Sequence, residues 1–384
     1  MKIGIDATNI GSGGGVTHLK EIINNYDYDS FKDKIELLTI FSSQKILDQL
    51  EDYDFIRKVT FENLNKSLLH RVYFQFFKYD SEIIKHCDIL YSLTGDYIGK
   101  FKPLVGMSRN MLLYERDIWI DIKYPKEIMR FWLNYKKQKR CFKESKGIIF
   151  ISKYAENFIT KILPLENKSK STIYHGLSPR FIAKVNKQKN IREYDFKNPF
   201  KLLYISTVHV YKNHINLVNA IAILRKNGYP VVLSLIGGVI FKPEGSKLLK
   251  AIIDVDPKKE FIFFHGNIEY EKIDSHYRNS DGIVFASSCE NMPNILLESM
   301  ASGVPIACSN KDPMPEFLRK GGFYFDAKSV PSIVENLITF LESPEDREIK
   351  AKISLEQSKE FSWKKTSNET FNYLIQIYKN NIQS

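Results

Sequence analysis

Two glutamates stand eight positions apart, on either side of a proline, in the stretch SSCENMPNILLESMASGVPIACSN over residues 287–310. The preceding DGIVFAS predicts a buried strand, and Pro293 suits the first turn of a helix that ends at Gly303. Glu290 then lies in the loop between strand and helix. Glu298 lies just over one turn further, inside the helix.

The expected helix N-terminus indicates what these carboxylates could bind. Free backbone N–H groups near Asn294 and Ile295 favour a phosphate there. Because Glu290 is itself an anion, we expect it to bind hydroxyl groups beside that phosphate. The two oxygens of Glu298 suit a diol such as a ribose, which offers two donors. A pair of ordinary helix-surface glutamates is the alternative explanation.

Along the chain, strand-like apolar runs alternate with amphipathic helical patterns, as is typical of parallel α/β folds. The length of 384 residues favours two domains. Residues 181–199 are polar and without apolar periodicity, so we predict a linker there, between domains over 1–180 and 200–364. Doubly wound domains in tandem bind ligands at the carboxyl ends of their strands, which makes the interdomain cleft the default active site.

In this setting SSCENMPNILLESMASGVPIACS resembles the donor-site signature of the retaining glycosyltransferases of the GT-B fold, in the group called family 4. That signature runs from a strand through Glu, seven residues, Glu and MA.G.P to a second strand. GSGGG resembles the family's first loop, STVHVYKN its lysine-bearing loop and IYHGLSPRF its crossover. FSWKKTSNETFNYLIQIY, near the end of the chain, resembles the family's final helix. This implies that residues 365–384 pack back on the first domain.

The resemblance assigns roles in the donor half of the chain. It implies that Glu290 holds hydroxyls of the transferred sugar, Glu298 the nucleotide ribose, and Asn294 with its helix N-terminus the distal phosphate. Lys212 precedes Asn213, the expected N-cap of another helix, so its ammonium would neutralise the diphosphate and help it to leave without a metal. Further expected donor contacts are Pro293, Ile295, Ser206, Thr207, Asn267 and Ile268.

The glycines Gly11 to Gly15 are a weaker signal, because any tight strand-to-helix turn can need glycine. Within the GT-B fold, Gly13, Gly14 and Gly15 would approach the donor phosphate and the acceptor. A dinucleotide-binding dehydrogenase is the rival interpretation of this loop. The glycine spacing of the dinucleotide-binding fingerprint is absent, however, and a dehydrogenase would give Glu290 and Glu298 no function.

The first-domain loop VGMSRNMLLYE departs from the family. Many members have a histidine where this chain has Arg109, followed by Asn110. Arginine can bond a sugar hydroxyl or stabilise a departing phosphate, but it cannot act as a base near neutral pH. We place Arg109 with Lys212 and Glu290 as catalytic candidates, and an ion pair of Arg109 with Glu115 stays open as the alternative.

The net charge of +11 lies entirely in the first half of the chain. Residues 1–192 hold 33 Lys and Arg against 22 Asp and Glu. Two basic stretches with aromatic residues, 68–78 and the expected helix over 126–146, suit an anionic membrane surface. A helix packed on the sheet with a solvated lysine face is the alternative, and no recognised module supports nucleic acid.

The sequence also excludes several classes of protein. No apolar run is long enough to span a membrane and no signal-peptide core follows the first strand, so we expect a cytoplasmic protein, in a peripheral position at the inner face of the membrane if the basic stretches bind lipid. Four cysteines far apart predict neither a zinc site nor a disulfide framework.

Taken together, the resemblance implies a retaining glycosyltransferase that moves a hexose-type sugar from a UDP- or GDP-linked donor to a saccharide or lipid-linked saccharide. Bacterial surface polysaccharide, such as O-antigen or capsule, or glycolipid biosynthesis is the expected setting, with no cofactor and no metal. The alternative is a GT-B-like binding or partner subunit that keeps the donor site but has lost turnover, and Arg109 motivates it.

Overall fold

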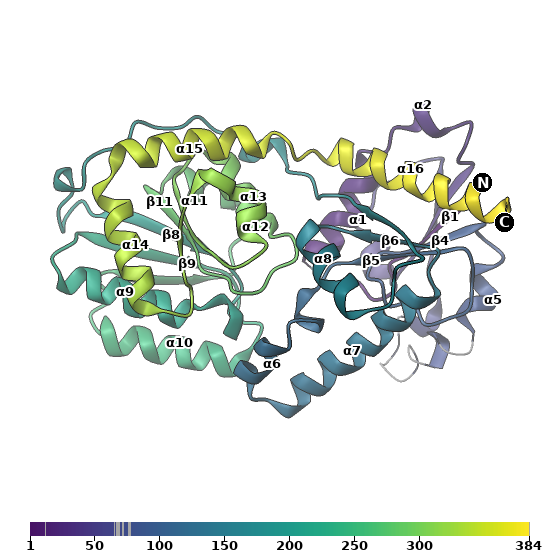
Figure 1. The fold of residues 1–384 in the computed structure, drawn as a ribbon, viewed down its shortest axis with the longest axis horizontal. Coiled ribbons are helices and arrows are strands. Elements are labelled where there is room, and N and C mark those ends of the chain that lie inside the picture. Colours follow the sequence, from purple (N-terminus) through teal and green to yellow (C-terminus); the bar gives the residue numbers. More distant parts are fainter. Residues whose placement is uncertain (12, 65, 67–69, 71–72, 76–77, 384) are drawn as a thin grey trace. The chain divides into compact units, whose positions relative to one another are not determined.

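The structure is a computed structural model that describes residues 1–11, 13–64, 66, 70, 73–75 and 78–383 (Figure 1). The chain divides into two compact units. Unit 1 comprises Met1–Arg116, Tyr124–Gly176 and Phe361–Ser384, and unit 2 comprises Asp117–Lys123 and Leu177–Glu360. Each is an α/β unit with a parallel sheet, as the sequence predicts.

Unit 1 contains a seven-stranded sheet of order β3-β2-β1-β4-β5-β6-β7, in which every pairing is parallel. Its central strands are almost fully buried, which explains their continuous apolar runs. The strands are β1 (Lys2–Asp6), β2 (Leu37–Phe41), β3 (Ile56–Val59), β4 (Ile89–Ser92), β5 (Leu104–Ser108), β6 (Gly147–Phe150) and β7 (Ser169–Thr172).

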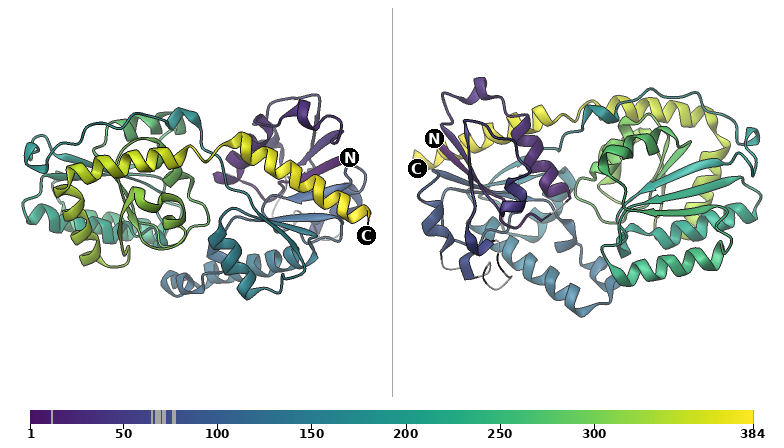
Figure 2. Two further views of the ribbon diagram at one scale, coloured as in Figure 1. Left: turned by 45° about the horizontal axis from the view of Figure 1, so that its top comes forward. Right: turned by 180° about the vertical axis from the view of Figure 1, so that it is seen from behind.

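The helices of unit 1 include the last helix of the chain, α16, which packs beside α1 (Figure 2). The Ser367 hydroxyl of α16 donates to the Ile22 carbonyl at 2.7 Å, and the Ile148 backbone N–H donates to the Tyr373 hydroxyl at 3.2 Å. The helices are α1 (Gly14–Asn24), α2 (Tyr28–Phe31), α3 (Gln44–Leu47), α5 (Tyr79–Ile83), α6 (Arg116–Ile122, all but its first residue in unit 2), α7 (Pro125–Glu144), α8 (Lys153–Ile162) and α16 (Trp363–Ile382).

Unit 2 contains a six-stranded parallel sheet of order β10-β9-β8-β11-β12-β13. Helix α9 contacts α10 and α14, and α12 contacts α13 and α15 (Figure 1). The strands are β8 (Phe200–Ile205), β9 (Val231–Ile236), β10 (Ile262–Gly266), β11 (Gly282–Phe285), β12 (Ile306–Ser309) and β13 (Gly322–Phe325), and the helices are α9 (His214–Lys226), α10 (Lys242–Val255), α11 (Ile273–Arg278), α12 (Asn294–Ala301), α13 (Met314–Leu318), α14 (Val330–Glu342) and α15 (Pro344–Ser358).

The strand order reverses once in each sheet, between β1 and β4 in unit 1 and between β8 and β11 in unit 2. At such a reversal the connecting helices leave on opposite faces of the sheet, so the loops at the carboxyl ends diverge and leave room for a ligand. These two reversal points are therefore the places in the fold where a ligand site is expected.

The structure differs from the predicted boundaries in several places. Residues 177–180 lie in unit 2 rather than in the first domain, and residues 361–364 lie in unit 1 rather than in the second. The stretch 181–199 lies inside unit 2, where Phe181 is buried and Arg347 donates to the Lys189 carbonyl at 2.6 Å. Residues 117–123 also lie in unit 2, although they come from the middle of the predicted first domain. Polarity alone marked 181–199 as a linker, but tertiary hydrogen bonds hold it against the second unit.

Candidate functional site

Two loops meet at the carboxyl edge of unit 2, where the strand order reverses between β8 and β11. The Ser288 N–H donates to the Tyr211 carbonyl at 2.8 Å. The Asn213 side-chain amide donates to the Ala286 carbonyl, also at 2.8 Å. These bonds hold the loop after β8 against the loop after β11, and the two loops carry Lys212 and Glu290.

Lys212 and Glu290 form an ion pair in which Nζ donates to Oε1. Their side chains are only 13% and 15% exposed. Burial by itself would lower the pKa of Lys212, but the Glu290 carboxylate outweighs it and raises that pKa above its usual value, so the ammonium stays charged. The structure therefore brings two of the predicted residues together with opposite charges.

A helix begins directly beside this ion pair. Asn213, with a left-handed φ of 51°, is the N-cap of α9, as the sequence predicts, and its side chain does not cap the helix. The backbone N–H groups at the start of α9 therefore add to the positive potential of the neighbouring Lys212. A diphosphate at this place would meet both.

Glu298 lies on α12 and is 6% exposed. Its Oε1 accepts a hydrogen bond from the Tyr270 hydroxyl at 3.0 Å, whereas Oε2 is buried and has no partner. Burial raises the pKa of Glu298 to about 7, against the opposing effects of the Tyr270 hydrogen bond, the Arg180 charge and the nearby Tyr277 hydroxyl. The Tyr277 hydroxyl itself donates to the Ile295 carbonyl at 3.3 Å. A buried carboxylate oxygen without a donor is costly, so this atom is ready to accept a ligand hydroxyl.

Sequence reasoning missed the residues that hold Glu298 in place. The Arg180 guanidinium lies 3.9 Å from the centre of the Tyr270 ring, and it donates to the Tyr270 carbonyl at 2.6 Å. Tyr270 in turn donates to Glu298. These residues come from three separate segments, and no spacing in the sequence pairs them.

A rim of backbone and small side chains follows the ends of β8, β9 and β10. Ser206 is buried, and a Cβ on Gly237, whose φ is 141°, would lie 2.0 Å from the Ser206 carbonyl oxygen. A Cβ on Gly238 would lie 2.5 Å from Asn267 Oδ1. The predicted Thr207 and Asn267 are exposed, and Ile268 is half-buried. The sequence reasoning missed Gly237 and Gly238, although two glycines directly after a strand were a usable signal.

Helix α12 begins one residue later than predicted. Pro293 is the N-cap rather than a member of the first turn, and Asn294 and Ile295 are the first two helical residues. No acidic residue lies in the first turn, and no side chain caps it. Gly303, with a φ of 69°, follows the C-cap Ser302, which agrees with the predicted end of the helix.

The predicted first-domain residues lie in unit 1. Gly13 is the N-cap of α1 with a φ of 69°, and Gly14 and Gly15 are its first residues. Arg109 follows β5, and a Cβ on Gly15 would lie 3.0 Å from its Nη1. Among the residues that the structure describes, Arg109 has no ion pair, so the alternative of a pair with Glu115 is wrong.

Asn110 serves the local backbone. It accepts a hydrogen bond from the Leu112 N–H at 3.0 Å and so caps a short 3₁₀ helix, Met111–Leu113.

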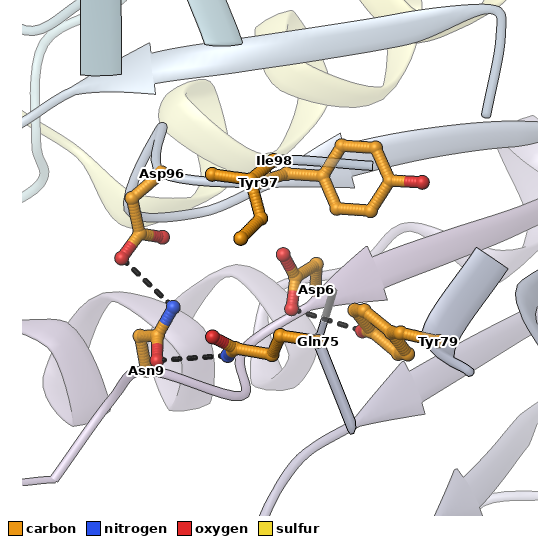
Figure 3. A pocket seen from close by; sticks show the side chains of 7 residues that line it. All are labelled: Asp6, Asn9, Gln75, Tyr79, Asp96, Tyr97 and Ile98. Atoms are coloured by element: carbon orange, nitrogen blue, oxygen red, sulfur yellow. Dashed lines mark hydrogen bonds between the residues drawn. The ribbon is translucent and has the colours of Figure 1, made fainter. Parts of the chain in front are cut away.

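A second polar cluster, which the sequence reasoning missed, lies at the reversal point of unit 1 (Figure 3). The Tyr79 hydroxyl donates to Asp6 at 2.9 Å, the Asn9 amide to Asp96 at 2.8 Å, and the Gln75 amide to Asn9 at 3.0 Å. Burial, and then the nearby charge of Asp96, raise the pKa of Asp6 to about 6. The residues that line this cluster are Asp6, Asn9, Gln75, Tyr79, Asp96, Tyr97 and Ile98.

The described residues contain no group of three or more His, Cys, Asp or Glu side chains that could hold a metal ion. All four cysteines are buried and free, as expected. Among the described residues, positive charge at the reversal point of unit 2 comes from the Lys212 ammonium and from the N-terminus of α9.

Comparison with known families identifies the second half of the chain. Residues 186–354 match the family model described as glycosyl transferases group 1. An O-antigen chain mannosyltransferase B of Escherichia coli is 28% identical over 173 residues, which are 44% of this chain and 44% of that protein. A sulfoquinovosyl transferase of Arabidopsis thaliana is 25% identical over 162 residues, 35% of this chain and 32% of that protein. The matched segments span less than half of either relative.

Solved structures match over nearly the whole chain at low identity. The sucrose-phosphate synthase of Thermosynechococcus elongatus has a TM-score of 0.76 at 14% identity, covering 99% of this chain and 100% of its own. The HepE protein of Anabaena, solved in complex with UDP, has a TM-score of 0.70 at 17% identity, covering 98% and 99%. The same protein was also solved with UDP-glucose. These similarities confirm the predicted GT-B fold.

Proposed function

We propose that this chain, whose residues 186–354 are a glycosyl transferases group 1 domain, transfers a hexose-type sugar from a nucleoside-diphosphate sugar to a saccharide or lipid-linked saccharide, with retention at the anomeric carbon. The donor is UDP- or GDP-linked. The low-identity structural neighbour that binds UDP and UDP-glucose is compatible with such a donor.

One observation carries the proposal, namely the buried Oε2 of Glu298 that has no donor. In the same unit Lys212 and the start of α9 offer positive charge, and Glu290 offers a second carboxylate. A nucleoside diphosphate sugar has a diol, a diphosphate and sugar hydroxyls, which these three features match in chemistry. A ligand that lacked the diol, the diphosphate or the sugar hydroxyls would leave Glu298, Lys212 or Glu290, respectively, without a binding partner in the ligand.

The chemistry then follows from the ion pair. As the glycosidic bond to the diphosphate breaks, negative charge grows on the leaving phosphate, and a preorganised ammonium and helix N-terminus stabilise that charge. Glu290 accepts hydrogen bonds from hydroxyls of the sugar and so fixes its orientation. Lys212 and Glu290 hold each other in place until the donor binds, and each then has its own part of the donor to contact.

The test measures binding and turnover side by side. Titration calorimetry with UDP, GDP and their glucose and mannose conjugates identifies the donor, and release of nucleoside diphosphate without an acceptor reports turnover. We expect binding of one sugar nucleotide together with slow hydrolysis. Binding with no hydrolysis and no transfer to any saccharide would instead support the alternative, a GT-B-like binding subunit in which Arg109 has replaced a catalytic histidine.

For the acceptor we propose an intermediate of bacterial surface polysaccharide, O-antigen or capsule, or of a glycolipid. The partial similarity to an O-antigen mannosyltransferase supports this setting. The chain as described has no helix of the length and apolarity that crossing a membrane requires. A lipid-linked acceptor therefore requires a surface of the protein that binds the membrane peripherally.

Helix α7 offers such a surface in unit 1. Met129, Trp132 and Leu133 are 57%, 44% and 48% exposed, and their spacing places them on one face of the helix. The opposite face buries Phe131 and Phe142. The exposed face continues into basic side chains, and Lys136 lies 5.3 Å from the centre of the Trp132 ring. Of the other basic aromatic stretch, 68–78, most residues lie outside the described part of the chain.

We therefore predict salt-sensitive binding to anionic vesicles, because each basic residue near such a surface contributes about 1 kcal/mol until salt screens it. Changing Lys136, Lys137, Lys139 and Arg140 to glutamate should abolish vesicle sedimentation and leave donor hydrolysis intact. The matched control reverses Lys189, Lys226, Lys258 and Lys320, four exposed lysines of unit 2. A wild-type protein that ignores anionic vesicles at low salt contradicts the membrane assignment and favours a soluble acceptor.

A further inference from the structure

Arg109 is a cation that forms no ion pair with the described residues of unit 1. Its Nε is buried without a hydrogen-bond partner, and no carboxylate among the described residues pairs with the guanidinium. Burial lowers the pKa of Arg109 to about 10, and the charged form still dominates at neutral pH. Arg109 as a whole is half-buried, but its Nε lies in the interior without a partner. A buried donor without an acceptor is unfavourable, so binding of an anion at the guanidinium would stabilise the protein.

The start of helix α1, which lies beside Arg109, adds to the positive charge there. Nη1 of Arg109 lies 3.0 Å from where a Cβ on Gly15 would be, so the guanidinium packs against the second residue of α1. Helix α1 is eleven residues long, has no acidic residue in its first turn and has no side-chain cap at Gly13. The N-terminus of a helix carries a partial positive charge, and an arginine there adds repulsion rather than relieving it.

Two described neighbours of the guanidinium, His18 and Tyr91, supply no negative charge. His18 is 1% exposed, and burial, the neighbouring His175 and Arg109 itself lower its pKa, so His18 stays neutral. Tyr91 is also near, and burial raises its pKa, so it too is uncharged. A side chain on Gly15 would press on Arg109 Nη1, so the glycine leaves room for the guanidinium beside the start of α1.

We propose that Arg109 and the first turn of α1 form an oxyanion site for the acceptor substrate, which takes a phosphate or carboxylate group of that substrate. The proposal rests on the proposed glycosyl transfer. Unit 2 has its own cation for the donor diphosphate, Lys212, so the charge at Arg109 serves a second anion. The planar guanidinium binds two oxygens of such a group side by side, and N–H groups of the first turn of α1 bind a third.

Calorimetry on the full-length Lys212→Ala variant tests this site apart from the donor site. The probes are inorganic pyrophosphate and glucuronate, which represent a phosphate and a carboxylate source. We expect one of them to bind, and Arg109→Gln to weaken that binding by about tenfold or more, as loss of a charge-assisted pair does. Arg109→Lys should lie between, because it keeps the charge but loses the two-pronged geometry. Arg57→Gln, at an exposed arginine of unit 1, is the matched control and should change nothing.

Two further measurements keep the proposal falsifiable. In protein with an intact Lys212, Arg109→Gln should leave nucleoside diphosphate affinity unchanged; a loss equal to that of Lys212→Ala would mean that Arg109 serves the donor, and the acceptor site would be refuted while the proposed function stands. Arg109→Met should unfold at no lower temperature than wild type in anion-free buffer, because it removes an unpaired charge. A clear drop in that midpoint, or no binding of either probe, also overturns the proposal.

Discussion

The reversal points of the two sheets have the same topology but opposite states of hydrogen bonding. In unit 1, Asp6, Asn9 and Asp96 bond one another or their neighbours (Figure 3). In unit 2, Glu298 has a buried oxygen with no hydrogen-bond partner among the described residues, and Lys212 and Glu290 form an ion pair with each other. The topology therefore says where a ligand can bind, and the unsatisfied Glu298 oxygen indicates that the reversal point of unit 2 is prepared for one.

Two buried carboxyl groups make the same contrast on a smaller scale. Burial raises the pKa of Asp6 to about 6 and that of Glu298 to about 7. Asp6 Oδ1 accepts hydrogen bonds from the hydroxyls of Thr8 and Tyr79 at 2.8 and 2.9 Å, and from the Thr8 backbone. We infer that Asp6 stabilises the loop after β1, whereas Glu298 keeps one oxygen for a ligand.

The largest effect that the comparison predicts is at Lys212. Lys212→Ala should reduce turnover by about a hundredfold or more and weaken nucleoside diphosphate binding, because one preorganised charge partner of the leaving group is lost. Lys226→Ala, at the other end of α9, is the control. Steady-state kinetics and calorimetry measure both. Unchanged kinetics in Lys212→Ala would remove this ion pair from the site and with it the main difference between the two reversal points.

The second prediction separates the two glutamates of unit 2. Glu298→Gln should weaken the nucleoside diphosphate and the whole sugar nucleotide equally, by about tenfold, since both contain the ribose. Glu290→Gln should weaken only the sugar nucleotide, because its partners are sugar hydroxyls. Competition binding with the two ligands measures this difference. Equal weakening of both ligands by Glu290→Gln would show that the assignment of Glu290 to the sugar is wrong.

The third prediction concerns pH and follows from the pKa of Glu298, about 7 in the empty site against a usual 4.5. Ribose hydroxyls donate best to the ionised form, so nucleoside diphosphate affinity should rise with pH through 7 and level off above about 8. At pH 6 roughly one site in eleven is ionised, which weakens binding by up to about tenfold. Glu298→Gln should remove this part of the pH profile, and an identical profile in that variant would contradict the prediction.

The same group should act on stability with the opposite sign. The folded state holds the Glu298 proton more tightly than the unfolded state does, so ionisation destabilises the free protein above pH 7. This destabilisation disappears as the pH falls below the usual value of 4.5. Unfolding of wild type and Glu298→Gln at several pH values without ligand measures it.

The smallest expected effect is that of a chelator. If Lys212 and the start of α9 supply the charge that the diphosphate needs, EDTA should leave turnover within about twofold of its original value. Loss of activity in EDTA with recovery in magnesium would assign that charge to a metal ion instead. The positive charge of Lys212 and the start of α9 would then no longer explain how the reversal point of unit 2 differs from that of unit 1.

Much of the fold was predictable because strand periodicity and local caps are properties of short segments. The buried strands Gly282–Phe285 and Ile306–Ser309, the N-cap Asn213 and the helix end before Gly303 all agree with the sequence pattern. The edge strands β3 and β13 were not predicted, since four residues of mixed polarity are too few to show a period.

By itself, the sequence determined the α/β class, the two-unit chain and the spacing of Glu290 and Glu298, because each depends on residues close together in the chain. Only the tertiary structure decided that Lys212 meets Glu290, and that Tyr270 bonds one oxygen of Glu298 while the other has no partner. It also decided that no carboxylate of the described residues pairs with Arg109. These are contacts or absences between distant segments. Their energies depend on burial and on which partners the fold supplies, and neither can be predicted from a short segment of sequence.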